Sequence, residues 1–231
     1  MARLTAMTPI MTNADRARVS EAVSAVERRT AGEVVTIVTR QSDDYAEIAM
    51  LWSILVAFLA LAALALFPDF YLGIYDRLTG GWVQEWHPRG VFAVALLVAS
   101  LKFAGMWLLQ LWRPLRLFLV PGPLKHARVR ARAITCFKVG AERRTHGRTG
   151  ILIYLSMRER RAEIVADEAI AGKVDPLVWG EAMAAMLAHI REGRIAEGMV
   201  AAIGEVGDVL AEHFPLAEGD TNELPDRLIE V

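Results

Sequence analysis

Hydrophobic positions gather in two long segments near the middle of the chain. Residues 48–67, with the sequence IAMLWSILVAFLALAALALF, carry no charge, and residues 91–112 carry one charged residue, Lys102. About 20 residues of helix, each rising about 1.5 Å, cross a hydrocarbon core roughly 30 Å thick. The pattern therefore predicts two transmembrane helices, joined by an aromatic, turn-rich loop over residues 68–90.

The polar segment before the first apolar run predicts a capped helix. Thr12 and Asp15 have the spacing of a capping box, in which a hydroxyl and an acid satisfy the first backbone donors of a helix. Valines follow at helical spacing, so we expect a helix over about residues 13–31, with Gly32 in the left-handed conformation that often ends helices. Ser42 is expected to cap the helix that enters the membrane.

Three short segments predict strands. Residues 33–39, EVVTIVT, and residues 150–156, GILIYLS, are apolar on both faces and suit central positions in a sheet. Residues 161–167 alternate apolar and charged positions, as a half-buried strand does, and a turn at 157–160 joins them to the preceding strand as a hairpin. We expect the first two strands to lie side by side and parallel, across a crossover that contains both apolar segments.

The remaining polar sequence predicts helices. Residues 124–145 form a helical pattern dense in arginine, after a break at residues 121–123. Two amphipathic helices then complete the domain. Their apolar positions are Trp179, Met183, Leu187 and Ile190 in the first helix, and Met199, Ile203, Val206 and Leu210 in the second.

The composition of the whole chain narrows the class of protein. The 231 residues are 54% hydrophobic, with a mean hydropathy of +0.31. The net charge of -1 gives no global basic field, so nucleic acid is not an expected partner. Cys136 is the single cysteine, which excludes an intrachain disulfide and allows a reducing compartment. The first residues contain no long apolar run before a small-residue cleavage site, so insertion is expected to depend on the internal hairpin.

Charge asymmetry predicts the orientation in the membrane. Residues 113–148 contain ten lysines and arginines and one acid, whereas the loop 68–90 contains two arginines. Because basic segments stay on the cytoplasmic side, we predict a plasma (inner) membrane protein with two spans and both termini in the cytoplasm. Residues 12–47 and 113–214 then lie on the same side and form one domain, followed by a tail over residues 215–231.

The two cytoplasmic segments resemble a known domain. The likeness lies in ERRTAGE followed by VVTIVT, and in RTGILIYLSMRERRAEIVADEAI followed by two helices. These residues are similar to the TPM domain, shared by thylakoid-lumen phosphatase-like proteins, photosystem II repair proteins and many bacterial membrane proteins. The resemblance covers roughly residues 12–47 and 124–214, and the ending resembles a bacterial subgroup with an internal membrane hairpin. It implies an α/β fold, a small αβα sandwich around a mixed sheet, interrupted here by a two-helix transmembrane hairpin.

The resemblance also raises the question of catalysis, because some plant members are reported as acid phosphatases or as calcium-binding. A cysteine phosphatase needs arginine six residues after its cysteine, but Glu142 stands at that spacing from Cys136. Cys136 is therefore predicted to be a small buried hydrophobe. The sequence has no aspartate-nucleophile, P-loop, zinc-protease, serine-hydrolase or EF-hand motif.

Carboxylates at the ends of predicted strands are the remaining candidates for metal chemistry. Asp43 and Asp44 follow the first strand, and Asp167 and Glu168 follow the third. Such oxygens suit Ca²⁺ or Mg²⁺, but turns and helix caps favour the same residue types. We favour the turn and cap roles, so no cofactor is assigned and Ca²⁺ or Mg²⁺ is the alternative.

Two sets of cations have open interpretations. Lys102 either carries its ammonium group to an interface along its apolar stem, or faces a carboxylate or carbonyl on a partner's transmembrane helix. The basic segment after the second span is expected to set the topology, and it can at the same time attract anionic lipid headgroups. Its candidate residues are Arg113, Arg116, Lys125, Arg128, Arg130 and Arg132.

Two functions follow from these observations. The first is a non-catalytic accessory or assembly factor in the lipid bilayer, which binds another membrane protein or forms a homo-oligomer. The second is a metal-assisted phosphatase that uses Ca²⁺ or Mg²⁺. The sequence favours the first function, because it contains no recognisable nucleophile or metal motif.

Overall fold

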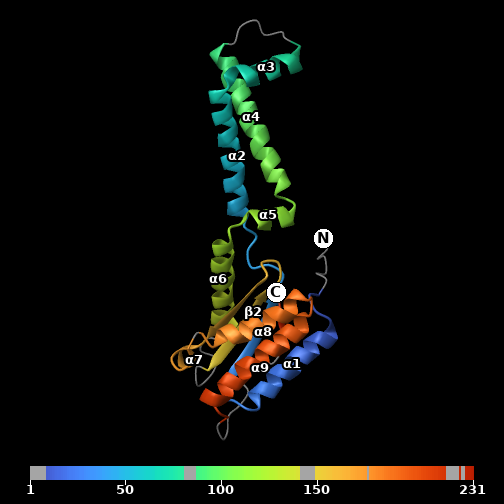
Figure 1. Cartoon of the computed structure of the whole chain (residues 1–231), viewed down its shortest axis with the longest axis vertical. Helices are drawn as coiled ribbons and strands as arrows, with labels where there is room; N and C mark the ends of the chain where they lie inside the picture. Colours follow the sequence, from blue (N-terminus) through green and yellow to red (C-terminus); the bar gives the residue numbers. More distant parts are fainter. Residues whose placement is uncertain (1–8, 81–86, 141–148, 176, 217–223, 225–226) are drawn as a thin grey trace, which may run out of the picture. The chain divides into compact units, whose positions relative to one another are not determined.

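The computed structural model describes residues 9–80, 87–140, 149–175, 177–216, 224 and 227–231, and it divides into two compact units (Figure 1). Met1–Asp43 and Gly122–Val231 form the first, which we term the sheet unit. Asp44–Pro121 form the second, the hairpin unit. The hairpin unit is therefore an insertion in the sequence of the sheet unit.

The sheet unit is built on a mixed sheet with the strand order β3-β2-β1-β4. The bounds are Glu33–Thr39 for β1, Gly150–Ser156 for β2, Arg161–Ala166 for β3 and Ile229–Glu230 for β4. β1 pairs in parallel with β2 and with β4, and β2 pairs antiparallel with β3. Val34 lies opposite Ile151, and Thr39 lies opposite Ser156. The predicted parallel pairing of the first two strands and the predicted hairpin are both confirmed.

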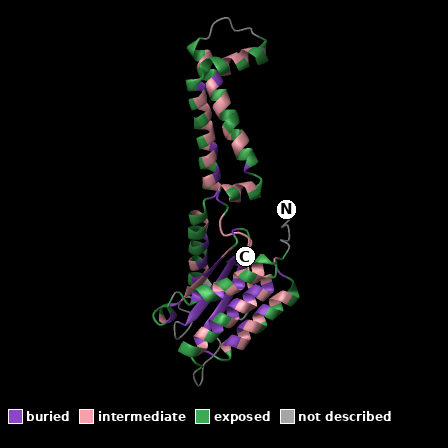
Figure 2. Ribbon diagram, in the orientation of Figure 1, coloured by how far each residue is buried: buried purple, intermediate pink, exposed green. Residues whose placement is uncertain are grey.

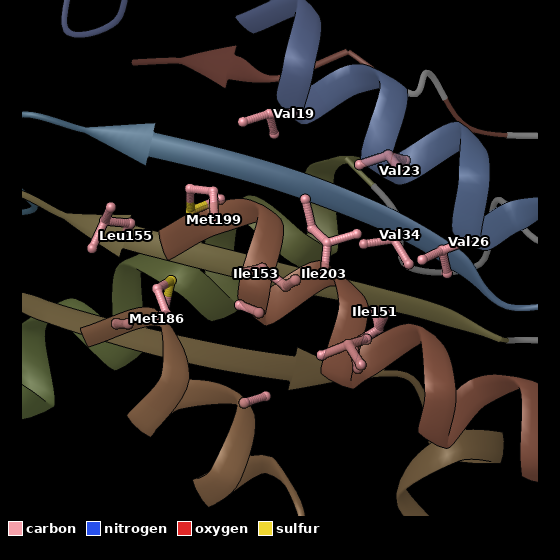
Figure 3. Packing of buried hydrophobic residues seen from close by; sticks show 14 of the residues in the cluster. Val19, Val23, Val26, Val34, Ile151, Ile153, Leu155, Met186, Met199 and Ile203 are labelled. Atoms are coloured by element: carbon pink, nitrogen blue, oxygen red, sulfur yellow. The ribbon is translucent and has the colours of Figure 1, made fainter. Parts of the chain in front are cut away.

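Helices cover one face of this sheet with a continuous hydrophobic core (Figure 3). The bounds are Asn13–Glu27 for α1, Glu168–Ala171 for α7, Trp179–Arg191 for α8 and Ile195–His213 for α9. The predicted capping box begins α1: Asp15 N donates to Thr12 Oγ1 at 3.1 Å, and Thr12 N donates to Asp15 Oδ2 at 3.4 Å. The predicted amphipathic helices are α8 and α9, whose fully buried residues include Met186, Met199 and Ile203.

Glycines allow the helices and the sheet to approach closely on this face. A Cβ atom at Gly207 would lie 2.4 Å from Val26 Cγ2, so α1 and α9 meet where α9 has no side chain. Gly32 has a related role, because a Cβ there would lie 2.9 Å from Leu210 Cδ1. The prediction of a left-handed Gly32 is wrong, since its φ is not positive and α1 has already ended with its C-cap at Arg28.

The helix α6 (Gly122–Gly140) packs on the opposite face of the sheet. Its apolar stripe of Val129, Ala133 and Phe137 contacts the inward side chains of β1 and β2, among them Leu152 and Tyr154. Helices therefore cover both faces, and the predicted α/β fold class with a mixed sheet is confirmed. The predicted helical residues 141–145 lie outside the described part of the chain.

The described residues of the hairpin unit form two long apolar helices and two shorter ones. The bounds are Ala46–Leu66 for α2, Pro68–Thr79 for α3, Pro88–Leu109 for α4 and Arg113–Leu119 for α5. α2 and α4 pack against each other and are each long and apolar enough to cross a membrane. Most of their surface is exposed (Figure 2), including large apolar side chains such as Phe58 and Phe92. In water such surface would be costly, so it fits an apolar surrounding.

Two sequence predictions about this region need correction. The prediction of a turn-rich loop over residues 68–90 missed α3. This helix has Pro68 in its first turn, and its C-cap residue is Gly80, with a φ of 84°. Proline at a helix start and a left-handed glycine at its end are both helix signals. Ser42 does not cap α2, because the N-cap residue is Tyr45, whose side chain makes no capping hydrogen bond.

Candidate functional site at the carboxyl ends of β1 and β2

Polar side chains gather where the two central strands end. β1 and β2 finish in register at Thr39 and Ser156. The chain then continues through Ser42 on one side and through a turn containing Glu159 on the other. Ligand sites of open α/β sheets lie outside the carboxyl ends of parallel strands, so this position is a candidate ligand site.

Glu159 organises a closed set of hydrogen bonds at this position. Its carboxylate is buried and accepts from the backbone N–H of Ser42 at 2.9 Å and from the Ser156 hydroxyl at 2.5 Å. The Ser42 hydroxyl in turn lies 3.0 Å from the Tyr154 hydroxyl. Each of these polar groups has a partner within the sheet unit, so the network stabilises the ends of the strands. We term Ser42, Tyr154, Ser156 and Glu159 the polar network.

Two groups here could act as nucleophiles if deprotonated: Tyr154, within the network, and Cys136, beside it. Both have raised pKa values, which favour the protonated forms. Burial raises the pKa of the Cys136 thiol, and the nearby Arg132 guanidinium offsets only part of that rise. Burial also raises the pKa of Tyr154, with smaller opposing effects from the Ser42 hydrogen bond and Arg132. A nucleophilic cysteine needs a lowered pKa, so Cys136 is not activated. It is half-buried beside Val35 and Leu152, as predicted for a small hydrophobe.

The predicted carboxylate candidates fall into two places. Carboxylate oxygens of Asp43 and Asp44 lie within 4.8 Å of one another and of Glu47, whereas Asp167 and Glu168 lie apart from them. Asp43 follows the carboxyl end of β1 and pairs with Arg128, at 3.5 Å between Oδ2 and Nε. Asp167 follows β3, whose end lies beside Gly150 at the start of β2, so it is at the opposite end of the sheet. Asp44, in the hairpin unit, accepts from the Ala46 N–H at 3.1 Å, which is a local turn role.

Asp167 has one unusual feature. Its Oδ1 caps α7 by accepting from the Glu168 N–H at 2.8 Å, as predicted for a helix cap. Its Oδ2 is buried and has no hydrogen-bond partner among the described residues. Burying a carboxylate oxygen without a hydrogen-bond partner costs free energy, and a bound cation or water molecule usually supplies the missing contact. Glu168 is exposed beside it.

Several of the basic residues after the second span serve the protein itself. Arg130 and His126 lie 3.4 Å and 3.1 Å from the two oxygens of the buried Glu163 carboxylate on β3. Arg116 donates to the carbonyl oxygens of Gln110 and Asp44 within the hairpin unit. Of the other candidates, Arg132 lies near Tyr154 and Cys136. Arg113 is the first residue of α5, and Lys125 lies near the start of α6.

The hairpin unit contains one buried polar contact between its long helices. Gln110 is 1% exposed, and its Nε2 donates to Ala49 O at 2.9 Å and lies 3.3 Å from Ser53 Oγ. Sequence reasoning missed Gln110, Glu159 and Glu163, because each acquires its role from a partner far away in the sequence. Lys102 is exposed on α4, and no carboxylate among the described residues forms an ion pair with it.

Comparisons with known proteins identify the domain. A family model described as the TPM domain matches residues 124–209, which include most of α6 and extend into α9. The fold resembles the NMR structure of the BA42 protein from the psychrophilic bacterium Bizionia argentinensis, with a TM-score of 0.56 and 16% sequence identity. That alignment covers 97% of this chain and 98% of the BA42 chain. No curated protein matches this sequence. Residues 124–209 of the sheet unit therefore match the TPM domain model, as the sequence resemblance predicted.

Proposed function

We propose that this protein is a two-span inner-membrane protein whose TPM domain is a non-catalytic accessory or assembly module that binds another membrane protein. The observation that carries this proposal is the closed polar network at the ends of β1 and β2. Its donors and acceptors bind one another, and the adjacent thiol and phenol have raised pKa values. A site built in this way stabilises a fold but presents no activated nucleophile.

Membrane location is supported by the hairpin unit. α2 and α4 meet the length and hydropathy needed for two spans, and their large apolar side chains point outward. The proposed orientation has both termini in the cytoplasm, as the basic residues after the second span favour. The partner would be a membrane protein or a second copy of this chain, with no role for nucleic acid.

Three experiments test this proposal. The protein should stay in the membrane pellet after carbonate extraction. In a Cys136→Ala background, cysteine at the exposed His87 should react with a membrane-impermeant thiol reagent in intact cells, and cysteine at the exposed Glu181 should not. Purification from native membranes should then recover a stoichiometric membrane-protein partner or a homo-oligomer. Extraction by carbonate, the reverse labelling pattern, or a monomer without partners would contradict the proposal.

A metal-assisted phosphatase is the second candidate, and the buried, unpartnered Oδ2 of Asp167 is the observation that favours it. Carboxylate oxygens are ligands for Ca²⁺ and Mg²⁺. The detergent-solubilised protein should be assayed for phosphatase activity with each ion and with chelator. Activity that needs the ion and disappears in Asp167→Asn would establish this function. Equal release of phosphate by both proteins, at the level of buffer, would support the non-catalytic role.

A further inference from the structure

The β2–β3 turn adds basic residues to a part of the sheet unit that already carries several. Arg158 and Arg160 lie in this turn, and Arg158 N donates to Arg40 O at 3.0 Å, which places the end of β1 beside the turn. The Arg161 guanidinium donates to Gly122 O at 3.2 Å, so the start of α6 with Lys125 is also adjacent. We term Arg40, Lys125, Arg158, Arg160 and Arg161 the basic collar.

The ion pairs formed by the described residues leave most of the charge of the basic collar unpaired. Of the carboxylates nearby, Asp43 pairs with Arg128 and Glu163 pairs with Arg130. Glu159 accepts from the uncharged N–H of Ser42 and hydroxyl of Ser156, so it leaves one negative charge beside the five cations of the collar. Arg158 donates to the neutral side chain of Gln41 at 2.9 Å. Among the residues that the structure describes, no carboxylate forms an ion pair with Arg40 or Arg160. The collar therefore has an excess of positive charge.

Chain connectivity ties this end of the sheet unit to the hairpin unit. The chain leaves the sheet unit after Asp43, four residues beyond the end of β1, and it returns at Gly122, where α6 begins. An extended chain spans at most about 3.6 Å per residue, so connectivity keeps Arg40 within about 22 Å of Ala46, the first residue of α2. With the hairpin unit in a bilayer, as proposed, the headgroups at the start of α2 are therefore within that length of chain from Arg40.

We propose that the basic collar binds the headgroups of anionic phospholipids in the bilayer that holds the hairpin unit. This inference rests on the proposed membrane location. Anionic headgroups attract basic residues near the surface, and the attraction decays within a Debye length, so the collar acts by proximity. Topology does not require Arg158 or Arg160, because charges guide insertion mainly within about 15–20 residues of a span and α4 ends at Leu109.

The test measures lipid retention by the full chain in neutral detergent, using native mass spectrometry with dioleoyl-phosphatidylglycerol and dioleoyl-phosphatidylcholine as probes. The wild type should retain phosphatidylglycerol at least fivefold better than phosphatidylcholine. The triple variant Arg40→Gln, Arg158→Gln, Arg160→Gln should lose at least fivefold of its affinity for phosphatidylglycerol. Retention of phosphatidylcholine should change less than twofold.

The matched control removes the same charge from other parts of the sheet unit. Arg28→Gln, Arg29→Gln, Lys173→Gln alters three exposed cations at the end of α1 and after α7, and its affinity for phosphatidylglycerol should change less than twofold. Equal affinity in the wild type and the collar variant, or equal loss in both variants, would overturn the proposal. If the collar triple variant has a lower thermal midpoint, the single exposed change Arg160→Gln replaces it and should lose about twofold; no loss would again overturn the proposal.

Two competitors separate the lipid from other anions. Free glycerol 3-phosphate, or a 20-nucleotide RNA, should not displace phosphatidylglycerol at equal concentration. Displacement by glycerol 3-phosphate would assign the collar to a soluble phosphate compound, and displacement by RNA would assign it to nucleic acid; either result overturns the lipid proposal. Extraction of the protein from membranes by carbonate would instead refute the membrane location. Failure of the lipid proposal can therefore be distinguished from failure of the proposed location.

Discussion

Glu230 and Arg16 form an ion pair of 2.9 Å between Oε1 and Nε, although 214 residues separate them in the sequence. The same carboxylate accepts from the backbone N–H groups of Ile10 and Met11, at 3.0 and 3.2 Å. One side chain on β4 therefore fastens the segment before α1 to the edge of the sheet.

The Glu230 contacts should make the stability of the sheet unit depend on pH. Burial opposes ionisation of this carboxyl, but the N–H donors of Ile10 and Met11 and the charge of Arg16 outweigh it, so the pKa is lowered. The unfolded pKa of glutamate is about 4.3. The stabilisation is therefore present above that value and is lost as the pH falls through the lower, folded pKa.

Glu230→Gln should lower the stability at pH 7 by about 1–3 kcal/mol and reduce the loss of stability as the pH falls below about 4.3. Hydrogen exchange at the Ile10 and Met11 amides reports the same contacts and should become faster in the variant. Glu212→Gln, an exposed change on α9, is the control. Unchanged exchange at both amides in Glu230→Gln would contradict this account.

The contact of α1 with α9 predicts opposite effects for two glycines of one helix. Gly207→Ala would place a Cβ 2.4 Å from Val26 Cγ2 and should destabilise the protein by about 1–3 kcal/mol, because the helices must separate. Gly204→Ala on the same helix meets nothing within 4 Å and should stabilise it by up to about 1 kcal/mol, through helix propensity. Chemical denaturation of both variants gives the two differences, and effects of the same sign would refute the packing argument.

Loss of the Glu159 charge should be visible at Tyr154. Glu159→Gln leaves one acceptor oxygen for Ser42 N and Ser156 Oγ, so we expect a cost of about 1–3 kcal/mol. Because the Glu159 charge contributes to the raised pKa of Tyr154, phenolate formation should move to lower pH in the variant. Ultraviolet absorbance near 295 nm, followed against pH, measures the formation of phenolate. An identical titration curve in the folded variant would exclude the coupling, and Glu181→Gln serves as control.

The thiol of Cys136 should react slowly at neutral pH. Burial raises its pKa above the ordinary value of 9.0, so the midpoint of alkylation against pH should lie above that value. Arg132 partly counteracts burial, so Arg132→Gln should move the midpoint higher still, whereas Lys138→Gln on the exposed side of α6 should not. A midpoint below 8 would instead indicate an activated cysteine.

The sequence predicted those elements whose signals are local. The β-branched run of β1, the capping box of Thr12 and Asp15 and the periodic apolar residues of α8 and α9 each lie within a short window. The polar network was not predictable in this way, since Ser42 and Glu159 are 117 residues apart. A serine before a helix resembles a cap, and only the folded strands show that its N–H binds a carboxylate.

Charge was harder to interpret than hydrophobicity for the same reason. Arg128 and Arg130 looked like members of one basic segment, yet each pairs with an acid from another part of the sheet unit. Arg158 and Arg160 looked like ordinary turn residues, and the fold brings them beside Arg40 and the start of α6. Sequence spacing reports the number of charges in a segment but not which of them are neutralised by distant partners.

The insertion of the hairpin unit between adjacent strands has a consequence for synthesis of the protein. When β1 leaves the ribosome, the strand that pairs with it on one side has not been made, and β4 completes the other edge at the end of the described chain. With the proposed membrane location, both edges of β1 stay open while the hairpin segment enters the bilayer. We therefore expect the sheet unit to fold after membrane insertion, and a chain that stalls at this stage would expose an aggregation-prone strand.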